Sequence, residues 1–178
     1  TTRQRGVVIY AHRNLTLQAE STPFNKEGCF LILVGRLSMV LVTIDTLYAL
    51  NSSLEPFLRQ FLHTSGGGVA KGVILLSGDC NSVLDLGVDR ESGRASSSPA
   101  FSRHLRTSLT DLGLQDARQA HQPTLPRFTY YSHSHRTYSR IVYIFISTRL
   151  IPCINDLVLS PIAVSDHAPL TLHLSWPL

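Results

Sequence analysis

Short hydrophobic runs broken by turn residues characterise the first 50 positions of the chain. We expect strands at Gly6–Tyr10, Cys29–Val34 and Met39–Tyr48, with Gly35 and Arg36 forming the turn between the last two. Runs of this length that are rich in β-branched residues are typical of strands with at least one buried face. Strands that follow one another through short turns predict an antiparallel meander.

The spacing of the apolar positions then changes from a strand pattern to a helix pattern. Between Leu54 and His63 apolar side chains recur every three or four residues, which indicates an amphipathic helix, and Asn51-Ser52-Ser53 offers capping side chains in front of it. A second helix is expected at Phe101–Leu112. The glycines of Ser65–Gly68 should end the first helix, and Ser92–Pro99 should form a surface loop.

Strand-like runs return in the second half. They are expected at Val73–Leu76, Ile141–Ile146, Cys153–Leu159 and Leu170–Leu174. Arg127–Arg140, which is basic and aromatic, has the pattern of a hairpin. Since helices are few and lie among strands that also follow one another directly, we expect an α/β sandwich with a mixed sheet.

Composition limits the size and the partners of such a fold. With 178 residues, of which 43% are hydrophobic, the chain has material for one core, so we expect a single domain over residues 1–178. A net charge of +4 with eight histidines agrees with an anionic partner without identifying one. Cys29, Cys80 and Cys153 lack the spacing of a disulfide framework or a zinc site, which favours a reducing, intracellular compartment. No secretory signal and no apolar stretch of about 20 residues is present, so a membrane partner is not expected.

Two polar clusters stand directly beside strand-like runs. Ser77–Asn81 follows a strand, so Asp79 and Asn81 should emerge at its carboxyl end, and Ser165–Pro169 precedes another strand. A carboxylate beside an amide or an imidazole supplies oxygen ligands for a hard cation together with an acid or base. Taken alone, Gly78–Asn81 is better explained as an ordinary turn, and Ser165–His167 is only slightly more specific.

The clusters belong to a series of motifs that occur in a fixed order. The segments are Asp45–Asn51, Gly78-Asp79-Cys80-Asn81, Asp89-Arg90, Leu112–Asp116, Phe128–Ser132, Ser139–Tyr143 and Ser165–Pro169. In this order they resemble the motifs of the endonuclease/exonuclease/phosphatase superfamily. Within it, the chain is most similar to the apurinic/apyrimidinic endonuclease-like domains of LINE-type retrotransposon polyproteins.

The resemblance implies a four-layer sandwich of two mixed β-sheets flanked by helices, and hydrolysis of a phosphodiester by water with Mg²⁺ as the usual ion. It implies that Asp79 positions or deprotonates the water and that Asn81 and His167 contact the phosphate. Asp166 would belong to the surroundings of the metal and of His167. Tyr48 and Asn51 would line the phosphate site.

The resemblance also implies DNA as the partner. In this branch of the superfamily the hairpin matched by residues 127–140 helps to recognise target DNA, which makes Thr129, Arg136, Ser139 and Arg140 candidate nucleic-acid contacts. A solvated hairpin without function explains the charge equally well. A reverse transcriptase in the same polyprotein and a nuclear location would accompany this origin.

Some positions depart from the family pattern. Val142 stands where the family has an aspartate that orients the catalytic histidine, and the strands that carry the family's amino-terminal Asn and metal-binding Glu would precede Gly6. Two hypotheses follow. One is a Mg²⁺-dependent endonuclease domain, here without its amino-terminal strands, and the other is an inactive fragment that at most binds nucleic acid. A phosphatase for a small substrate fits the superfamily but not the retrotransposon-like motifs.

Overall fold

The computed structural model describes residues 6–49, 54–91, 99–123 and 128–176. Its centre is a six-stranded mixed sheet in the order β1-β2-β3-β4-β8-β5, in which β3 and β4 are parallel and the other neighbours antiparallel. The strands are β1 (Leu17–Ser21), β2 (Phe30–Leu37), β3 (Val40–Tyr48), β4 (Val73–Asp79), β5 (Leu114–Asp116) and β8 (Val142–Ser147). The expected α/β class with a mixed sheet is therefore confirmed.

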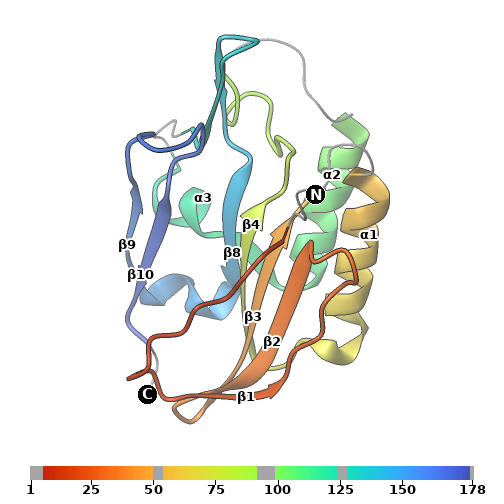
Figure 1. The fold of residues 1–178 in the computed structure, drawn as a ribbon, viewed down its shortest axis with the longest axis vertical. Coiled ribbons are helices and arrows are strands. Elements are labelled where there is room, and N and C mark those ends of the chain that lie inside the picture. Colours follow the sequence, from red (N-terminus) through yellow and green to blue (C-terminus); the bar gives the residue numbers. More distant parts are fainter. Residues whose placement is uncertain (1–5, 50–53, 92–98, 124–127, 177–178) are drawn as a thin grey trace, which may run out of the picture.

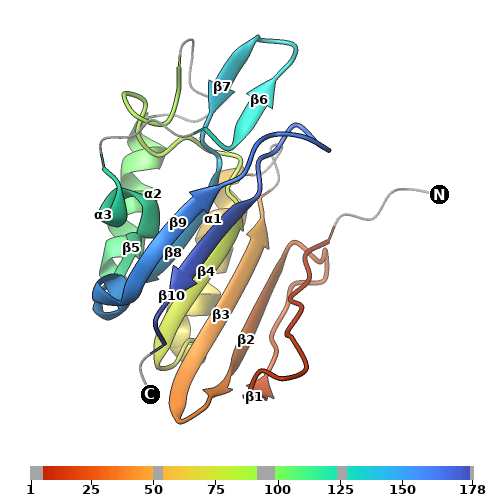
Figure 2. The ribbon, with the colours of Figure 1, turned by 90° about the vertical axis from the view of Figure 1, so that its left-hand side faces the viewer.

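Helices cover one face of this sheet and a second, smaller sheet covers the other (Figures 1 and 2). The helical layer is formed by α1 (Leu54–Thr64), which continues into a π-helical turn at Ser65–Val69, and by α2 (Pro99–Asp111). The second sheet consists of the antiparallel strands β9 (Ile154–Leu159) and β10 (Leu170–Leu174). A short helix α3 (Ala117–His121) and a 3₁₀ turn (Thr148–Cys153) lie between the layers at one edge.

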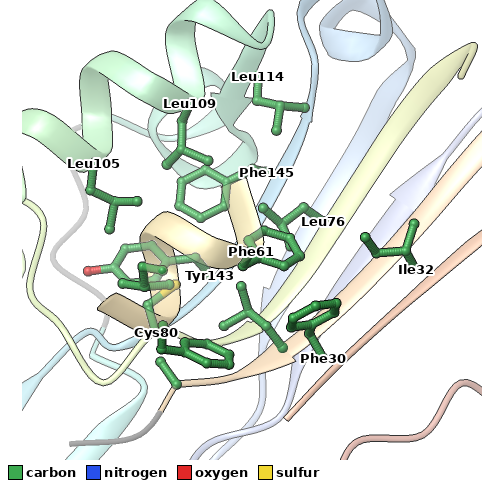
Figure 3. Packing of buried hydrophobic residues seen from close by; sticks show 14 of the residues in the cluster. Phe30, Ile32, Phe61, Leu76, Cys80, Leu105, Leu109, Leu114, Tyr143 and Phe145 are labelled. Atoms are coloured by element: carbon green, nitrogen blue, oxygen red, sulfur yellow. The ribbon is translucent and has the colours of Figure 1, made fainter. Parts of the chain in front are cut away.

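Alternation along the central strands creates two hydrophobic cores. In β4, Ile74 and Leu76 pack toward α1 and α2, whereas Val73 and Leu75 pack toward β9 and β10. Figure 3 shows the first core, where Phe30, Phe61 and Tyr143 fill the space between sheet and helices. Burial on both faces explains the continuous apolar run of this strand. None of the helices in the described ranges is long and apolar enough to cross a membrane.

Two expectations about the first strands are wrong. Gly6–Tyr10 forms no strand, and the chain instead pairs at Leu17–Ser21. The turn between β2 and β3 lies at Ser38 and Met39, with Ser38 in the left-handed region at φ 56°. Gly35 lies inside β2, where a Cβ atom would approach the Gln18 carbonyl oxygen to 2.3 Å, so this glycine permits close strand contact and makes no turn.

The helices and strands expected after Tyr48 are present, with bounds that differ from the expected ones by a few residues. The helices at Leu54 and Phe101 and the strands at Val73, Ile141, Cys153 and Leu170 are all present, and β10 has the expected bounds. The hairpin expected at residues 127–140 is formed by β6 (Tyr130–Ser132) and β7 (Thr137–Ser139). The expected cap at Asn51–Ser53 and most of the expected loop at Ser92–Pro99 lie outside the described residues.

Candidate phosphodiesterase site

Three strand ends meet at one edge of the central sheet. Because β3 and β4 are parallel, Tyr48 and Asp79 end side by side, and the antiparallel β8 begins there with Val142 opposite Asp79. The β6–β7 hairpin and the loop before β10 stand over the same edge, which we call the rim (Figure 2). The two polar clusters that the sequence pointed to are therefore brought together here.

Backbone hydrogen bonds from neighbouring residues and the glycine before it fix the position of Asp79. Its Oδ1 accepts a hydrogen bond of 2.8 Å from the Asn81 N–H, and its carbonyl accepts one from Ala49. Gly78 has φ 148°, and a Cβ there would lie 2.0 Å from the Leu47 carbonyl oxygen. The close approach of β3 to β4 just before Asp79 therefore requires glycine.

His167 faces two carboxylates and one aromatic ring. Its Nε2 lies 3.9 Å from Oδ2 of Asp79 and 4.0 Å from Oδ1 of Asp166, and its ring centroid lies 4.9 Å from that of Tyr130. Ser165 fixes the loop, because its hydroxyl accepts from the His167 N–H at 2.9 Å. The side chain of Asp79 is 12% exposed and that of His167 32%, so solvent reaches both groups and reaches His167 more freely.

Burial raises the pKa of the Asp79 carboxyl above its ordinary value. The hydrogen bond from Asn81 and the imidazole of His167 act against this rise, whereas the Asp166 carboxylate adds to it. Asp79 therefore holds a proton more readily than an exposed aspartate does.

Asn81 and Tyr48 lie at the rim, and their phosphate contacts stay predictions, while Asn51 lies outside the described residues. Asn81 adopts a left-handed backbone with φ 45°, and its Nδ2 donates to the Ala49 carbonyl at 2.6 Å. One N–H of this amide is thus used to join the ends of β3 and β4, and a second N–H remains on the group. Tyr48 is half-buried beside Asp79.

Val142 gives the rim an apolar wall. It lines an open groove of about 480 Å³ together with Ser77, Ser165 and His167. Residues opposite each other in an antiparallel pair place their side chains on the same face, so Val142 and Asp79 point the same way. Val142, where the resemblance led us to expect an aspartate, thus offers His167 no hydrogen-bonding atom.

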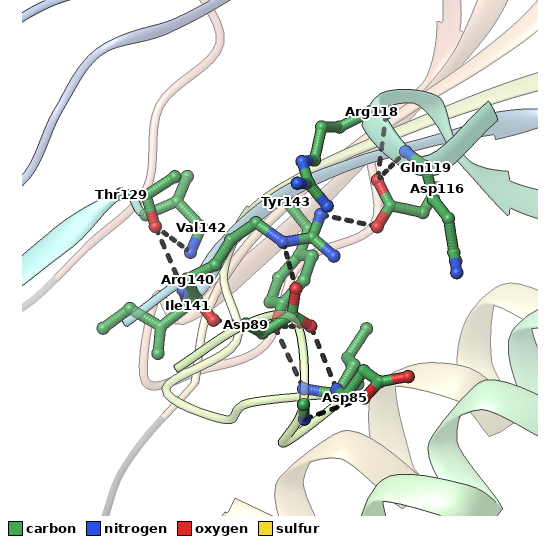
Figure 4. A network of polar contacts seen from close by, with 12 residues as sticks. Asp85, Asp89, Asp116, Arg118, Gln119, Thr129, Arg140, Ile141, Val142 and Tyr143 are labelled. Atoms are coloured by element: carbon green, nitrogen blue, oxygen red, sulfur yellow. Dashed lines mark hydrogen bonds and ion pairs between the residues drawn. The ribbon is translucent and has the colours of Figure 1, made fainter. Parts of the chain in front are cut away.

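A buried network of ion pairs surrounds Arg140, two residues before Val142 (Figure 4). Arg140 donates through Nε to Asp89 at 2.7 Å and through Nη1 to Asp116 at 2.5 Å, with all three residues less than a tenth exposed. Burial opposes the charge on Arg140, but Asp116 and Asp89 outweigh this effect and raise its pKa. The Tyr143 hydroxyl lies 2.7 Å from the Arg140 carbonyl and accepts from the Leu84 N–H, and burial raises its pKa well above the usual value. Both therefore keep their protons.

Thr129 connects this network to the hairpin. Its hydroxyl accepts from the backbone N–H groups of Ile141 and Val142, each at 3.0 Å, and its carbonyl accepts from Ala168 beside His167. Thr129 is 1% exposed and Arg140 5%. Both side chains have structural partners inside the protein, so the DNA contacts expected for them from the sequence remain predictions.

The hairpin forms a second hollow next to the rim. A cleft of about 250 Å³ is lined by Asn81, Arg90, Tyr130, Ser132 and Ser139, among others. Ser139 is 7% exposed, whereas Arg136 stands exposed at the hairpin turn with φ 46°. The sequence alone did not single out Arg90 or Tyr130 as site residues. Both nevertheless lie within motifs of the ordered series, Arg90 in Asp89-Arg90 and Tyr130 in Phe128–Ser132, and this position could have pointed to them.

The donors for Mg²⁺ are few. Asp79 and Asp166 place carboxylate oxygens 3.9 and 4.0 Å from the same atom, Nε2 of His167, and carboxylate oxygen is a ligand type that Mg²⁺ accepts when phosphate oxygens and water complete its shell. Within the described ranges no group of three His, Cys, Asp or Glu side chains is arranged to hold a metal ion. The residues present therefore fit a weak, substrate-assisted ion site.

Comparison with known proteins agrees with this architecture. No family model matches the chain. Its structure superposes on an AP endonuclease from Archaeoglobus fulgidus with a TM-score of 0.69 at 15% identity, covering 92% of this chain and 71% of that one. AP endonuclease LMAP from Leishmania major gives 0.70 at 17% identity, with coverage of 93% and 63%. The 3′ phosphatase NExo from Neisseria, bound to a product DNA hairpin, gives 0.64 at 17% identity, with coverage of 92% and 71%.

These likenesses establish the fold. The chain has the α/β fold of the AP endonucleases and of the exonuclease and phosphatase proteins similar to them. Identities of 15–17% carry no residue-level role across to this chain, so the chemistry of the rim has to be argued from its own side chains.

Proposed function

We propose that the chain is a Mg²⁺-dependent phosphodiester hydrolase of the DNA endonuclease type. The observation that carries the proposal is the approach of His167 to Asp79 at the rim, under a hairpin with an exposed arginine at its turn. A base beside an imidazole, at a site open to a long polymer, is suited to attack by water on a phosphate diester. The fold shared with AP endonucleases supports the same reaction class.

Each rim residue has a task that its position allows. Asp79, whose pKa burial raises, takes the proton of the attacking water. His167 and the second N–H of Asn81 meet the phosphate oxygens on which negative charge grows. Tyr48 lines the wall next to Asp79. Asp166, which is half exposed, would hold Mg²⁺, and the bound ion would neutralise charge on the phosphate.

DNA is the substrate that the surroundings favour. Arg136 at the hairpin turn and Arg90 in the adjacent cleft offer cations for phosphates, and Ser139 lies on the wall of that cleft. Thr129 and Arg140 act through the backbone that they hold and thereby position the hairpin over the rim. The ordered motifs further support an origin in a LINE-type retrotransposon, where a reverse transcriptase would belong to the same polyprotein.

Plasmid nicking tests the proposal. We expect nicking by the chain in Mg²⁺ but not in EDTA, and a loss of roughly 10²-fold or more in Asp79→Ala and His167→Ala. Asp111→Ala, at the exposed end of α2, is the matched control and should nick like the parent. Equal nicking by all four proteins would show that the activity does not come from this rim.

A second candidate is a protein that binds nucleic acid without cutting it. Val142 leaves His167 without an orienting carboxylate, and the described residues offer few metal ligands. A lost orienting carboxylate lowers the turnover of comparable centres by about 10⁴-fold. Mg²⁺-dependent nicking that disappears in Asp79→Ala would exclude this candidate, and binding of DNA without any nicking would select it.

A further inference from the structure

The β6–β7 hairpin has two faces of different character. Tyr131 lies opposite Tyr138 on one face, whereas Tyr130 and Ser139 form the neighbouring pair, whose side chains point the other way. The second face lines the cleft of about 250 Å³ next to the rim, and its residues Ser132, Thr137 and Ser139 are buried. The first face is therefore directed to solvent, and Figure 2 shows the hairpin projecting beyond the end of the central sheet.

Aromatic rings cover the solvent face. The centroids of Tyr131 and Tyr138 are 4.6 Å apart, Phe128 stacks on Tyr138 at 6.1 Å with a 25° interplanar angle, and His133 meets Tyr131 at 4.8 Å. Tyr138 remains 41% exposed despite these contacts. We call these four residues the aromatic face. The solvent face of an antiparallel hairpin usually carries polar side chains, so four neighbouring aromatic residues on this face are not explained by folding alone.

One arginine and two imidazoles stand beside the aromatic face. Arg136, His133 and His135 are all exposed at the turn beside it. The carboxylates on neighbouring elements are Glu91, which accepts from the Tyr138 N–H, and Asp166, whose carbonyl accepts from the Tyr131 N–H. Cationic side chains next to stacked rings are the combination with which proteins hold the phosphates and bases of single strands.

We propose that the aromatic face binds unpaired nucleobases, so that the protein acts on DNA that carries a single-stranded segment beside the cleavage site. Bases inside a duplex have both ring faces covered by their neighbours, and only an unpaired base can stack on Tyr138. The inference rests on the proposed function for the choice of nucleic acid. Continuity with the rim supports it, because Tyr130, adjacent to Tyr131 in β6, contacts His167.

Binding without cleavage tests this inference. In EDTA, the affinity for a labelled oligothymidine is compared by fluorescence anisotropy with that for an equally long backbone that lacks bases. Both ligands carry the same phosphates, so their ratio reports base contacts alone. The parent should prefer oligothymidine by about tenfold, as expected for one or two stacked bases. Equal affinity of the parent for the two ligands would overturn the proposal.

Variants locate the base contact. Tyr138→Leu keeps an apolar side chain but lacks a ring and should lose the preference, whereas Tyr138→Phe should keep it. Tyr10→Leu, which removes a tyrosine that is 90% exposed outside the hairpin, is the control and should bind as the parent does. A preference that survives in Tyr138→Leu contradicts the assignment. If the parent shows no nicking in Mg²⁺ but keeps its preference for oligothymidine, only the proposed function is contradicted, because the binding assay in EDTA does not depend on catalysis.

Discussion

Nε2 of His167 lies 3.9 Å from Oδ2 of Asp79, although the two residues come from opposite halves of the chain. The parallel pairing of β3 with β4 brings Asp79 to the rim, and the hydrogen bond from Ala168 to Thr129 brings the loop of His167 over it. The imidazole thus has carboxylates on its Nε2 side and the ring of Tyr130 tilted against it at an interplanar angle of 47°.

Replacing Val142 with aspartate should raise Mg²⁺-dependent nicking. The new carboxylate would stand in the groove that Val142 shares with His167, where it can accept a hydrogen bond from the imidazole N–H and fix the orientation of the ring. We expect a gain on the order of 10²-fold in initial rate in the plasmid assay. Val142→Asn introduces a side chain with nearly the shape of aspartate but without its charge, so its nicking rate should rise much less. An unchanged rate in both variants would mean that His167 does not limit the reaction.

Loss of the buried arginine should be costly. Arg140→Ala would leave Asp89 and Asp116 as buried charges without their cation, for which about 3–5 kcal/mol of unfolding free energy is expected. Arg106→Ala breaks a comparable pair with Asp85, but there both side chains are more than a third exposed, so at most about 1 kcal/mol should be lost. Urea unfolding of the two variants measures the contrast. Similar midpoints would contradict the role given to the Arg140 network.

The parts of the fold that the sequence predicted are those whose local pattern and final environment agree. Val73–Leu76 reads as a buried strand because both of its faces are covered, and Leu54–His63 reads as a helix because only one side of it packs. Asp79 and His167 were found because each lies directly beside such a strand. In these cases the information sits within a few residues.

The failures concern contacts between distant segments. Gly35 was read as a turn residue, but it serves the close approach of Gln18 from β1, which no local pattern reveals. β5, with three residues, exists because Leu114 pairs with Ser147 of β8. The sequence likewise did not reveal that Thr129 and Arg140 bond inward to Val142 and Asp89, and the DNA contacts expected of these two residues remain predictions. Residue type alone could not distinguish these outcomes.

Gly78→Ala should disturb the rim more than any other single methyl group. The added Cβ would lie 2.0 Å from the Leu47 carbonyl oxygen at a φ of 148°, so β3 and β4 would have to separate just where Asp79 is placed. We expect a loss of about 2 kcal/mol or more in unfolding free energy together with a loss of nicking. Gly87→Ala is the control, because its Cβ would meet only the Asp85 side chain at 3.5 Å. Equal stability of the two variants would show that the strand approach is adjustable.

Asp45 should make the protein less stable as the pH rises toward neutral. It is fully buried in β3, where the Ser65 hydroxyl donates to its Oδ2 at 2.9 Å, while Oδ1 has no hydrogen-bond partner among the described residues. Burial raises its pKa to about 7, and the Ser65 hydrogen bond offsets only part of this rise. An unfolded aspartate has a pKa of about 3.9, so between these values the folded state keeps a proton that the unfolded state has released.

The contribution of Asp45 to the free energy of unfolding is therefore largest below about pH 4. It falls between about pH 4 and pH 7, by at most about 4 kcal/mol. Asp45→Asn removes the titration and keeps an acceptor for Ser65. Urea unfolding at pH 5 and pH 8 should show a smaller difference in this variant than in the parent, with the variant the more stable of the two at pH 8. Glu20→Gln, at an exposed ion pair with Arg36, is the matched control and should leave the parent's pH dependence unchanged. If Asp45→Asn preserves the full pH dependence, another group is responsible for it.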